Sequence, residues 1–254
     1  MKPIQRHFLV SLVMVFWVCL NTTPAQSREL AIAFSYDIPP FIIEDGTKGL
    51  EIDIVREALQ YKGYTFHIIQ CSYKRLQVAV SNMGLDAAAA VREADDGTFY
   101  SDSFIAFRNF AITKKKAGLV INSIADLKGK TIYTWQNAYN DLGEEFKALF
   151  SPEVTQPYRE KYKEIPVQAK QVESFWKGRD DLVIIIDEAI FKWFTRQLSV
   201  DVDTTGELVY HNLFENTTTF QVNFKERQIR DDFNEGLNYI RAKGLYQEIL
   251  NRYR

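Results

Sequence analysis

Four groups of polar and aromatic side chains directly follow predicted strands, and their types suit the binding of a small molecule. Tyr36 and Asp37 follow the first apolar strand, Arg92 follows a run of alanines, and Asp187 ends an apolar strand. The largest group follows the strand predicted at residues 131–134 and consists of Trp135, Gln136, Asn137 and Tyr139. In α/β proteins small ligands bind at the carboxyl ends of strands, so these side chains are candidate ligand contacts.

The aromatic members of these groups offer flat apolar faces to a ligand. An aromatic contact contributes about 0.5–1.5 kcal/mol beyond the area that it buries. We interpret Tyr36 and Trp135 as stacking residues, and we interpret Phe41, beyond a Pro-Pro turn, as loop packing. Asn137 has a second possible role, because asparagine is a favoured residue at the start of a helix.

The two charged candidates each have a structural alternative. Arg92 can hold a carboxylate through two parallel hydrogen bonds, or it can pair on the surface with Glu93 or Asp95. Asp187 stands between an apolar strand and a helix, where an aspartate commonly caps the helix. For Glu51 and Asp53, which open the first long helix, we favour a structural role, since carboxylates there interact favourably with the helix dipole.

Sequence patterns of catalysis are scarce after the first 27 residues. The histidines there are His67 and His211, and no metal-binding, nucleophile-elbow or phosphate-loop pattern occurs. Cys71 is the remaining cysteine, so no internal disulfide is expected. The net charge is −2 with both signs interspersed, which argues against a nucleic-acid-binding face. We therefore predict no catalytic residue, metal or cofactor.

Alternating strand and helix signals place the candidate side chains. Strands are predicted at residues 30–34, 65–69, 86–91, 109–113, 131–134 and 182–186. Helical spacing of apolar residues follows most of them, and the clearest stripe is Ile229, Phe233, Leu237 and Ile240. The proline-containing stretch 151–166 is predicted to be irregular. This order is typical of α/β folds.

The first 27 residues have the features of a cleavable export signal. Lys2 and Arg6 precede an apolar run, residues 8–20, that is too short for the ~20 residues of a spanning helix. Small residues suited to cleavage follow, although an uncleaved anchor is the alternative. We expect the protein in the periplasm, with about 225 residues for one large domain or two lobes.

Several short motifs occur in a characteristic order. They are GLEIDI at 49–54, YSDSF at 100–104, IADLKGK at 124–130, FNEGL at 233–237 and GLYQEI at 244–249. Their order and spacing resemble the periplasmic solute-binding proteins of ABC importers, family 3, which bind amino acids. The resemblance implies a two-lobed type II fold, with a mostly parallel sheet flanked by helices in each lobe and two crossover strands as a hinge. It places the signal peptide at 1–27, lobe 1 at 28–106 plus 220–254, and lobe 2 at 107–219.

The site implied by the resemblance differs from the family pattern at two places. Asp187 resembles the aspartate that pairs with the ligand ammonium group. The Thr-Pro-Glu-Arg motif, whose arginine holds the ligand carboxylate, is absent from residues 91–97. The usual glycine-serine or glycine-threonine pair is replaced by residues 135–137. The resemblance therefore implies a small polar ligand, an amino acid or a related compound, without fixing its identity.

Three functions are compatible with this resemblance. The preferred one is a monomeric receptor that closes around its ligand and delivers it to an ABC permease, with which it associates transiently. The second is an enzyme on the same scaffold, similar to cyclohexadienyl dehydratases, that recruits Glu51, Asp187 or Arg92. The third is a ligand-loaded partner of a membrane sensor.

Overall fold

The computed structural model describes residues 28–214 and 217–253, which form two β-sheets with flanking helices. The strands of the first sheet are β1 (Glu29–Ser35), β2 (Thr65–Cys71), β3 (Ala87–Val91), β4 (Phe99–Tyr100), β5 (Ile105–Phe107) and β11 (Thr218–Phe224). The strands of the second sheet are β6 (Asn109–Lys114), β7 (Thr131–Thr134), β8 (Tyr162–Glu164), β9 (Leu182–Asp187) and β10 (Leu208–His211). The predicted signal peptide lies outside the described residues.

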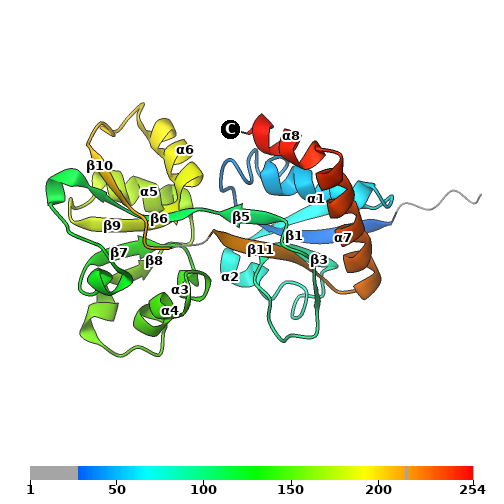
Figure 1. Ribbon diagram of the computed structural model, residues 1–254, viewed down its shortest axis with the longest axis horizontal. Helices are drawn as coiled ribbons and strands as arrows, with labels where there is room; N and C mark the ends of the chain where they lie inside the picture. The colour runs from blue at the N-terminus through cyan, green and yellow to red at the C-terminus, as the bar shows by residue number, and fades with distance from the viewer. Residues whose placement is uncertain (1–27, 215–216, 254) are drawn as a thin grey trace, which may run out of the picture.

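Each sheet with its helices is called a lobe below. The first lobe carries α1 (Leu50–Gln60), α2 (Tyr73–Leu76), α7 (Arg227–Ala242) and α8 (Leu245–Arg252). The second carries α3 (Ala138–Asp141), α4 (Glu144–Phe150), α5 (Gln168–Lys177) and α6 (Glu188–Leu198), and the 3₁₀ turns η1 (Lys115–Ala117), η2 (Ile124–Leu127) and η3 (Pro157–Lys161). Figure 1 shows the two lobes side by side along the long axis of the molecule. None of the described helices combines the length and the apolar character that a bilayer crossing requires.

The first sheet has the strand order β2-β1-β3-β11-β4, with β5 paired to β11. Strands β1, β2 and β3 are parallel, whereas β11 is antiparallel to β3. All of β3 is buried, as expected for a central strand, and its alanines let other elements approach closely. Helix α7 packs against α1, where Gly236 faces the backbone of Ala58. The alanine run is therefore confirmed as a buried strand.

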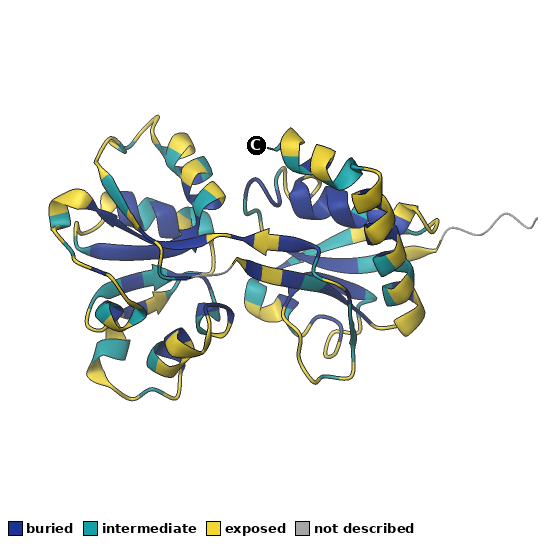
Figure 2. Ribbon diagram, viewed as in Figure 1, coloured by how far each residue is buried: buried dark blue, intermediate teal, exposed yellow. Residues whose placement is uncertain are grey.

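The second sheet has the order β10-β6-β9-β7-β8. Strand β9 is fully buried, because it lies in the middle of this sheet, parallel to β7 and antiparallel to β6. Figure 2 shows buried central strands in both sheets and exposed outer faces on the helices. Each lobe therefore buries the central strands of its own sheet, and one hydrophobic cluster continues from the first lobe into the second. The predicted α/β class is confirmed.

Two extended segments connect the lobes. The chain leaves the first lobe through β5 and returns through β11, and these strands pair with each other antiparallel, for example Phe107 with Thr218. Figure 1 shows β5 and the start of β11 between the two sheets. The predicted boundaries at residues 107 and 219 fall in this strand pair, and the division of the chain at those residues stays a prediction.

One local prediction was wrong. The stretch 151–166 is not irregular throughout, because it contains η3 and the edge strand β8. Strand β8 pairs in parallel with β7, and its first residue, Tyr162, is buried and packs on Phe146 and Phe150. Prolines flank this strand without interrupting it, so tertiary pairing decided the structure of a segment that lacks a clear local pattern.

Candidate functional site

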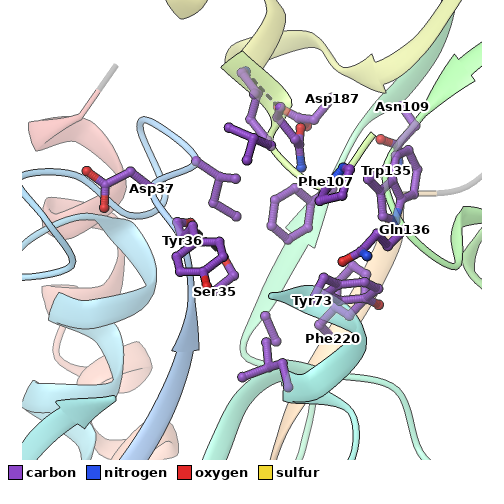
Figure 3. A pocket seen from close by; sticks show the side chains of 17 residues that line it. Ser35, Tyr36, Asp37, Tyr73, Phe107, Asn109, Trp135, Gln136, Asp187 and Phe220 are labelled. Atoms are coloured by element: carbon purple, nitrogen blue, oxygen red, sulfur yellow. Dashed lines mark hydrogen bonds between the residues drawn. The ribbon is translucent and has the colours of Figure 1, made fainter. Parts of the chain in front are cut away.

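A cavity of about 70 Å³ lies between the lobes, at the ends of β1, β7 and β9. This is room for several water molecules or part of a small organic molecule, because one water occupies roughly 10–15 Å³ by this measure. Figure 3 shows its side chains coming from both lobes and from the connecting strands. The aromatic members are Tyr36, Tyr73, Phe107, Trp135 and Phe220. The polar members are Ser35, Asp37, Asn109, Gln136, Gln168 and Asp187.

Five of the eight predicted site residues line this cavity, namely Tyr36, Asp37, Trp135, Gln136 and Asp187. Each follows or ends a strand, so the strand ends do bring them together. The other three, Arg92, Asn137 and Tyr139, are outside the lining. Whether any of the eight binds a ligand stays a prediction.

Tyr36 and Asp37 follow β1 but differ in what their side chains do. Tyr36 is 45% exposed and borders the cavity. The Asp37 carboxylate accepts hydrogen bonds from the backbone N–H groups of Asp45 (3.0 Å) and Gly46 (2.9 Å) and from the Gln70 amide (3.1 Å). In Figure 3 its oxygens point away from the other labelled side chains. The Asp37 carboxylate thus holds the following loop.

Asp187 is both a helix cap and a cavity residue. Its Oδ1 accepts from the backbone N–H groups of Ala189 (2.8 Å) and Ile190 (3.1 Å), and its Oδ2 accepts from the backbone N–H of Arg108 (2.8 Å). Burial raises the pKa of Asp187 to about 6, because desolvation outweighs these three hydrogen bonds. Asp187 therefore caps helix α6, as the structural alternative predicted, and it also lines the cavity.

A buried hydrogen-bond network joins the two lobes beside the cavity. Tyr73 Oη, from α2 in the first lobe, donates to Asp141 Oδ2 at 2.9 Å, and Trp135 Nε1 donates to the same oxygen at 2.8 Å. The Asp141 side chain is 1% exposed, and burial raises its pKa to about 6 against the effect of both donors. We call Tyr73, Trp135 and Asp141 the interlobe latch.

Arg92 lies next to this latch. It donates a hydrogen bond from Nη1 to the Thr219 carbonyl oxygen (3.0 Å), and its Nε is 4.0 Å from Asp141 Oδ1. Its guanidinium carbon lies 5.9 Å from the centre of the Phe220 ring. The carboxylate within ion-pair distance of Arg92 is that of Asp141, and not that of the expected partners Glu93 and Asp95. Arg92 therefore borders the connecting strands and contacts the outer side of the site.

Asn137 and Tyr139 are carried away from the cavity by the backbone. Asn137 has a φ of 58°, in the left-handed region, and makes no side-chain capping hydrogen bond to α3. Tyr139 instead packs partly against the core of the second lobe. The amide oxygen of Gln136 is buried and has no hydrogen-bond partner among the described residues.

The residues that the sequence prediction missed include the cavity residues Tyr73, Phe107 and Phe220, and also Asp141 beside the cavity. Tyr73 and Asp141 belong to the short helices α2 and α3. Tyr73 follows the end of β2 by two residues, so its position at a strand end could have indicated it, whereas Asp141 lies seven residues beyond β7. Phe107 and Phe220 lie in β5 and β11, the strands that connect the lobes, and their T-shaped ring contact has a centroid distance of 5.3 Å. Aromatic residues within crossover segments were the signal that could have found the second pair.

Solved structures of similar shape cover most of this chain. An ancestral arginine-binding protein bound to arginine matches with 17% identity and a TM-score of 0.70, over 89% of this chain and 97% of that one. The amino acid ABC transporter substrate-binding protein AbpA from Streptococcus pneumoniae, bound to L-arginine, matches with 17% identity and a TM-score of 0.67, over 89% and 94%. A histidine kinase sensor domain with similarity to periplasmic binding proteins matches with 14% identity and a TM-score of 0.70, over 89% and 96%.

The chain has the periplasmic-binding-protein fold. No protein-family model matches it, and no curated protein sequence does. At such low identities the likeness concerns the fold, and the site must be argued from its own side chains. The cavity lies between the two lobes of this fold, and side chains from both lobes line it.

Another buried acid is Glu51, in the first turn of α1. It is completely buried, and neither carboxyl oxygen has a hydrogen-bond partner among the described residues. Desolvation raises the pKa of Glu51 to about 8, so the carboxyl is mostly neutral at pH 7. The expected interaction of a charged Glu51 with the helix dipole is therefore wrong. Asp53 does have a structural role, because it accepts hydrogen bonds from Arg56, Arg252 and Tyr253.

Tyr73→Phe is expected to open the ligand-free protein. The change removes one of two donors to a buried carboxylate, and hydrogen bonds to charged groups contribute about 1.5–3 kcal/mol. The closed state should lose at least about tenfold in population relative to the open state. Small-angle scattering should show a larger radius of gyration than for the control Tyr158→Phe, whose ring packs on Phe150 outside the latch. Equal radii for both variants would contradict a role of the latch in closure.

Proposed function

We propose that the protein is an extracytoplasmic solute-binding protein that captures a small ligand between its two lobes and delivers it to an ABC-type permease. The observation that carries this proposal is the cavity, because side chains from both lobes line it. A ligand held there contacts both lobes only when they are closed, and such contacts supply the free energy of closure. The protein works in the periplasm as a monomer and associates with its permease transiently.

The comparisons support a binding protein. AbpA is an amino acid ABC transporter substrate-binding protein, and the ancestral protein binds arginine. We extend the general role, capture of a small solute, to this chain. As a binder it should form a stoichiometric complex, so assays with prephenate or arogenate should show no turnover. Steady product formation from either compound would favour the dehydratase-like alternative.

A sensory role is the second candidate, and one observation favours it. The histidine kinase sensor domain has a TM-score of 0.70 to this chain, as high as that of the arginine-binding protein. The same closed surface can serve a permease or a membrane sensor. Pull-down of the ligand-loaded protein with membranes from its own host, followed by identification of the partner, separates the two roles.

Substituting Trp135 is expected to weaken ligand binding. Truncation to alanine would also leave a hole, at a cost of about 3–5 kcal/mol, since Trp135 is only 8% exposed. Trp135→Phe keeps most of the ring and loses the Nε1 donor and part of the stacking face. We expect about a tenfold loss of affinity, which corresponds to 1.4 kcal/mol.

The measurement begins with a thermal-shift screen of amino acids, polyamines, small carboxylates and oligosaccharides, since a ligand raises the melting temperature by mass action. Calorimetry with the strongest hit then compares Trp135→Phe with the control Trp193→Phe, a tryptophan on α6 that does not line the cavity. The proposal predicts a loss of affinity in the first variant alone. A screen without any hit would contradict the proposed function, and equal affinities in both variants would contradict the role of Trp135.

A further inference from the structure

The charged groups at the cavity favour a cationic ligand. This inference rests on the proposed function and concerns the chemical class of the solute. The described residues that line the cavity include two aspartates and no lysine, arginine or histidine. A bound carboxylate would lack a cationic partner on this wall, and burying an unpaired charge is costly. An ammonium group would meet the opposite charge.

Asp187 is the acid with capacity for such a group. A carboxylate can accept about four hydrogen bonds. Three are made inside the protein, two at Oδ1 and one at Oδ2, so one acceptor position remains at Oδ2. Asp187 is 5% exposed, which means that a cation bound there would interact with it largely without screening by water. The Asp37 carboxylate also makes three hydrogen bonds, to the backbone of Asp45 and Gly46 and to the Gln70 amide, but its oxygens point away from the other labelled side chains.

Arg92 does not supply the missing carboxylate partner. Its Nη1 is hydrogen-bonded to the Thr219 carbonyl oxygen, and its Nε lies 4.0 Å from the buried Asp141 carboxylate. Its guanidinium carbon lies 5.9 Å from the centre of the Phe220 ring, which lines the cavity, whereas Arg92 itself does not. Turning Arg92 inward would remove positive charge from beside Asp141, whose side chain is 1% exposed.

The rest of the wall suits a cation with an apolar body. Five aromatic rings line the cavity, and their faces attract ammonium and guanidinium groups as well as apolar groups. The amide oxygens of Gln136 and Gln168 are buried without a hydrogen-bond partner among the described residues, and both residues line the cavity. Amide oxygens accept hydrogen bonds, so they complement the donors of an ammonium group.

We propose that the ligand is a small organic amine, protonated at neutral pH, that has an aromatic or apolar body and lacks a carboxylate. The ammonium group pairs with Asp187, and the body lies among the rings. Amino acids with the same side chain bind more weakly, because their carboxylate would be buried beside acidic and aromatic groups.

Matched compounds test this proposal. Calorimetry should compare 2-phenylethylamine with L-phenylalanine and 3-phenylpropanoate, which carry the same ring with an amine, both groups, or a carboxylate alone. Agmatine and L-arginine form a second pair. We expect each amine to bind at least about tenfold more tightly than its amino acid, a difference of 1.4 kcal/mol.

Tighter binding of the amino acids in both pairs would overturn the ligand class and leave the solute-binding function intact. If neither amine binds detectably, the ligand class is wrong too, and the broad thermal-shift screen then decides separately whether the protein binds any solute.

Asp187→Asn tests the role of the charge. Asparagine is also a favoured helix cap, so the start of α6 is preserved. Amine affinity should fall about ten- to hundredfold, the range of a charge-assisted hydrogen bond. The melting temperature of the free protein should also fall, because the Nδ2 group cannot accept the hydrogen bond from the Arg108 backbone N–H. The control Asp203→Asn removes an exposed carboxylate that bonds Thr205 outside the cavity, and it should leave the affinity unchanged. An unchanged affinity in Asp187→Asn would overturn the assignment of Asp187 as the ammonium partner.

Discussion

We expect Glu51 to lower the free energy of unfolding as the pH rises from 5 to 8. The variant Glu51→Gln should not show this decrease. In the folded state the pKa of Glu51 is raised from 4.5 to about 8 by burial. The folded protein therefore binds this proton more tightly than the unfolded chain does, and the contribution of Glu51 to stability is fully present below pH 4.5. It falls by roughly 1.4 kcal/mol per pH unit between the two pKa values, which amounts to roughly 5 kcal/mol at most.

Urea unfolding between pH 5 and 8 measures this effect. The wild type should lose free energy of unfolding steadily over this range, and Glu51→Gln should lose much less. Asp141 and Asp187 contribute in the same direction at lower pH, because burial raises their pKa values from 3.8 to about 6. The interval from pH 6.5 to 8 therefore isolates Glu51. Parallel stability profiles for the two proteins in that interval would show that Glu51 is ionised in the fold or that water reaches it.

Gly49→Ala is expected to destabilise the protein by about 3–5 kcal/mol. Gly49 has φ 127° and ψ 170°, a region that only glycine visits readily, and strain there costs about 1–3 kcal/mol. A Cβ would also lie 2.2 Å from the Phe41 carbonyl oxygen, which accepts the N–H of Glu51. Relieving this clash must move backbone, and overpacking of this kind costs a further 1–3 kcal/mol, roughly.

Thermal unfolding distinguishes the clash from the backbone strain. For a chain of this size, about 1 kcal/mol corresponds to roughly 2–4 °C, so the melting temperature should fall by about 10 °C. Gly63→Ala is the matched control, because Gly63 also has a positive φ, 80°, but nothing lies within 4 Å of its added Cβ. Its loss should be limited to about 1–2 kcal/mol of left-handed strain. Equal decreases in melting temperature for the two variants would mean that the backbone near Phe41 moves to accommodate the added Cβ without a loss of stability.

Both predictions concern residues of one sequence motif, GLEIDI at 49–54. The motif predicted the start of a helix, and α1 does begin at Leu50. The sequence did not indicate that Glu51 is buried without a partner, because burial depends on what packs above the helix. The reason for glycine at 49 was also hidden, since the carbonyl oxygen that excludes a side chain belongs to Phe41, eight residues earlier.

The candidate site was predictable to the extent that strand ends determine it. Tyr36, Trp135 and Asp187 end or follow strands and line the cavity, as their positions along the chain suggested. Asn137 and Tyr139 follow the same strand as Trp135 but do not line the cavity. The left-handed backbone at Asn137 turns the chain after two residues, and no residue pattern at that position predicted the turn.

The sequence by itself determined the α/β class and most of the order of strands and helices. These features arise from local periodicity, turn residues and runs of apolar side chains, which act over a few residues. Only the tertiary structure decided how the lobes meet. The contact of Tyr73 with Asp141 joins residues 68 positions apart. Whether Arg92 faces a ligand or the interlobe latch also depends on how the lobes pack together. The strand end determines the position of the Arg92 backbone, and the neighbouring residues determine the direction of its side chain.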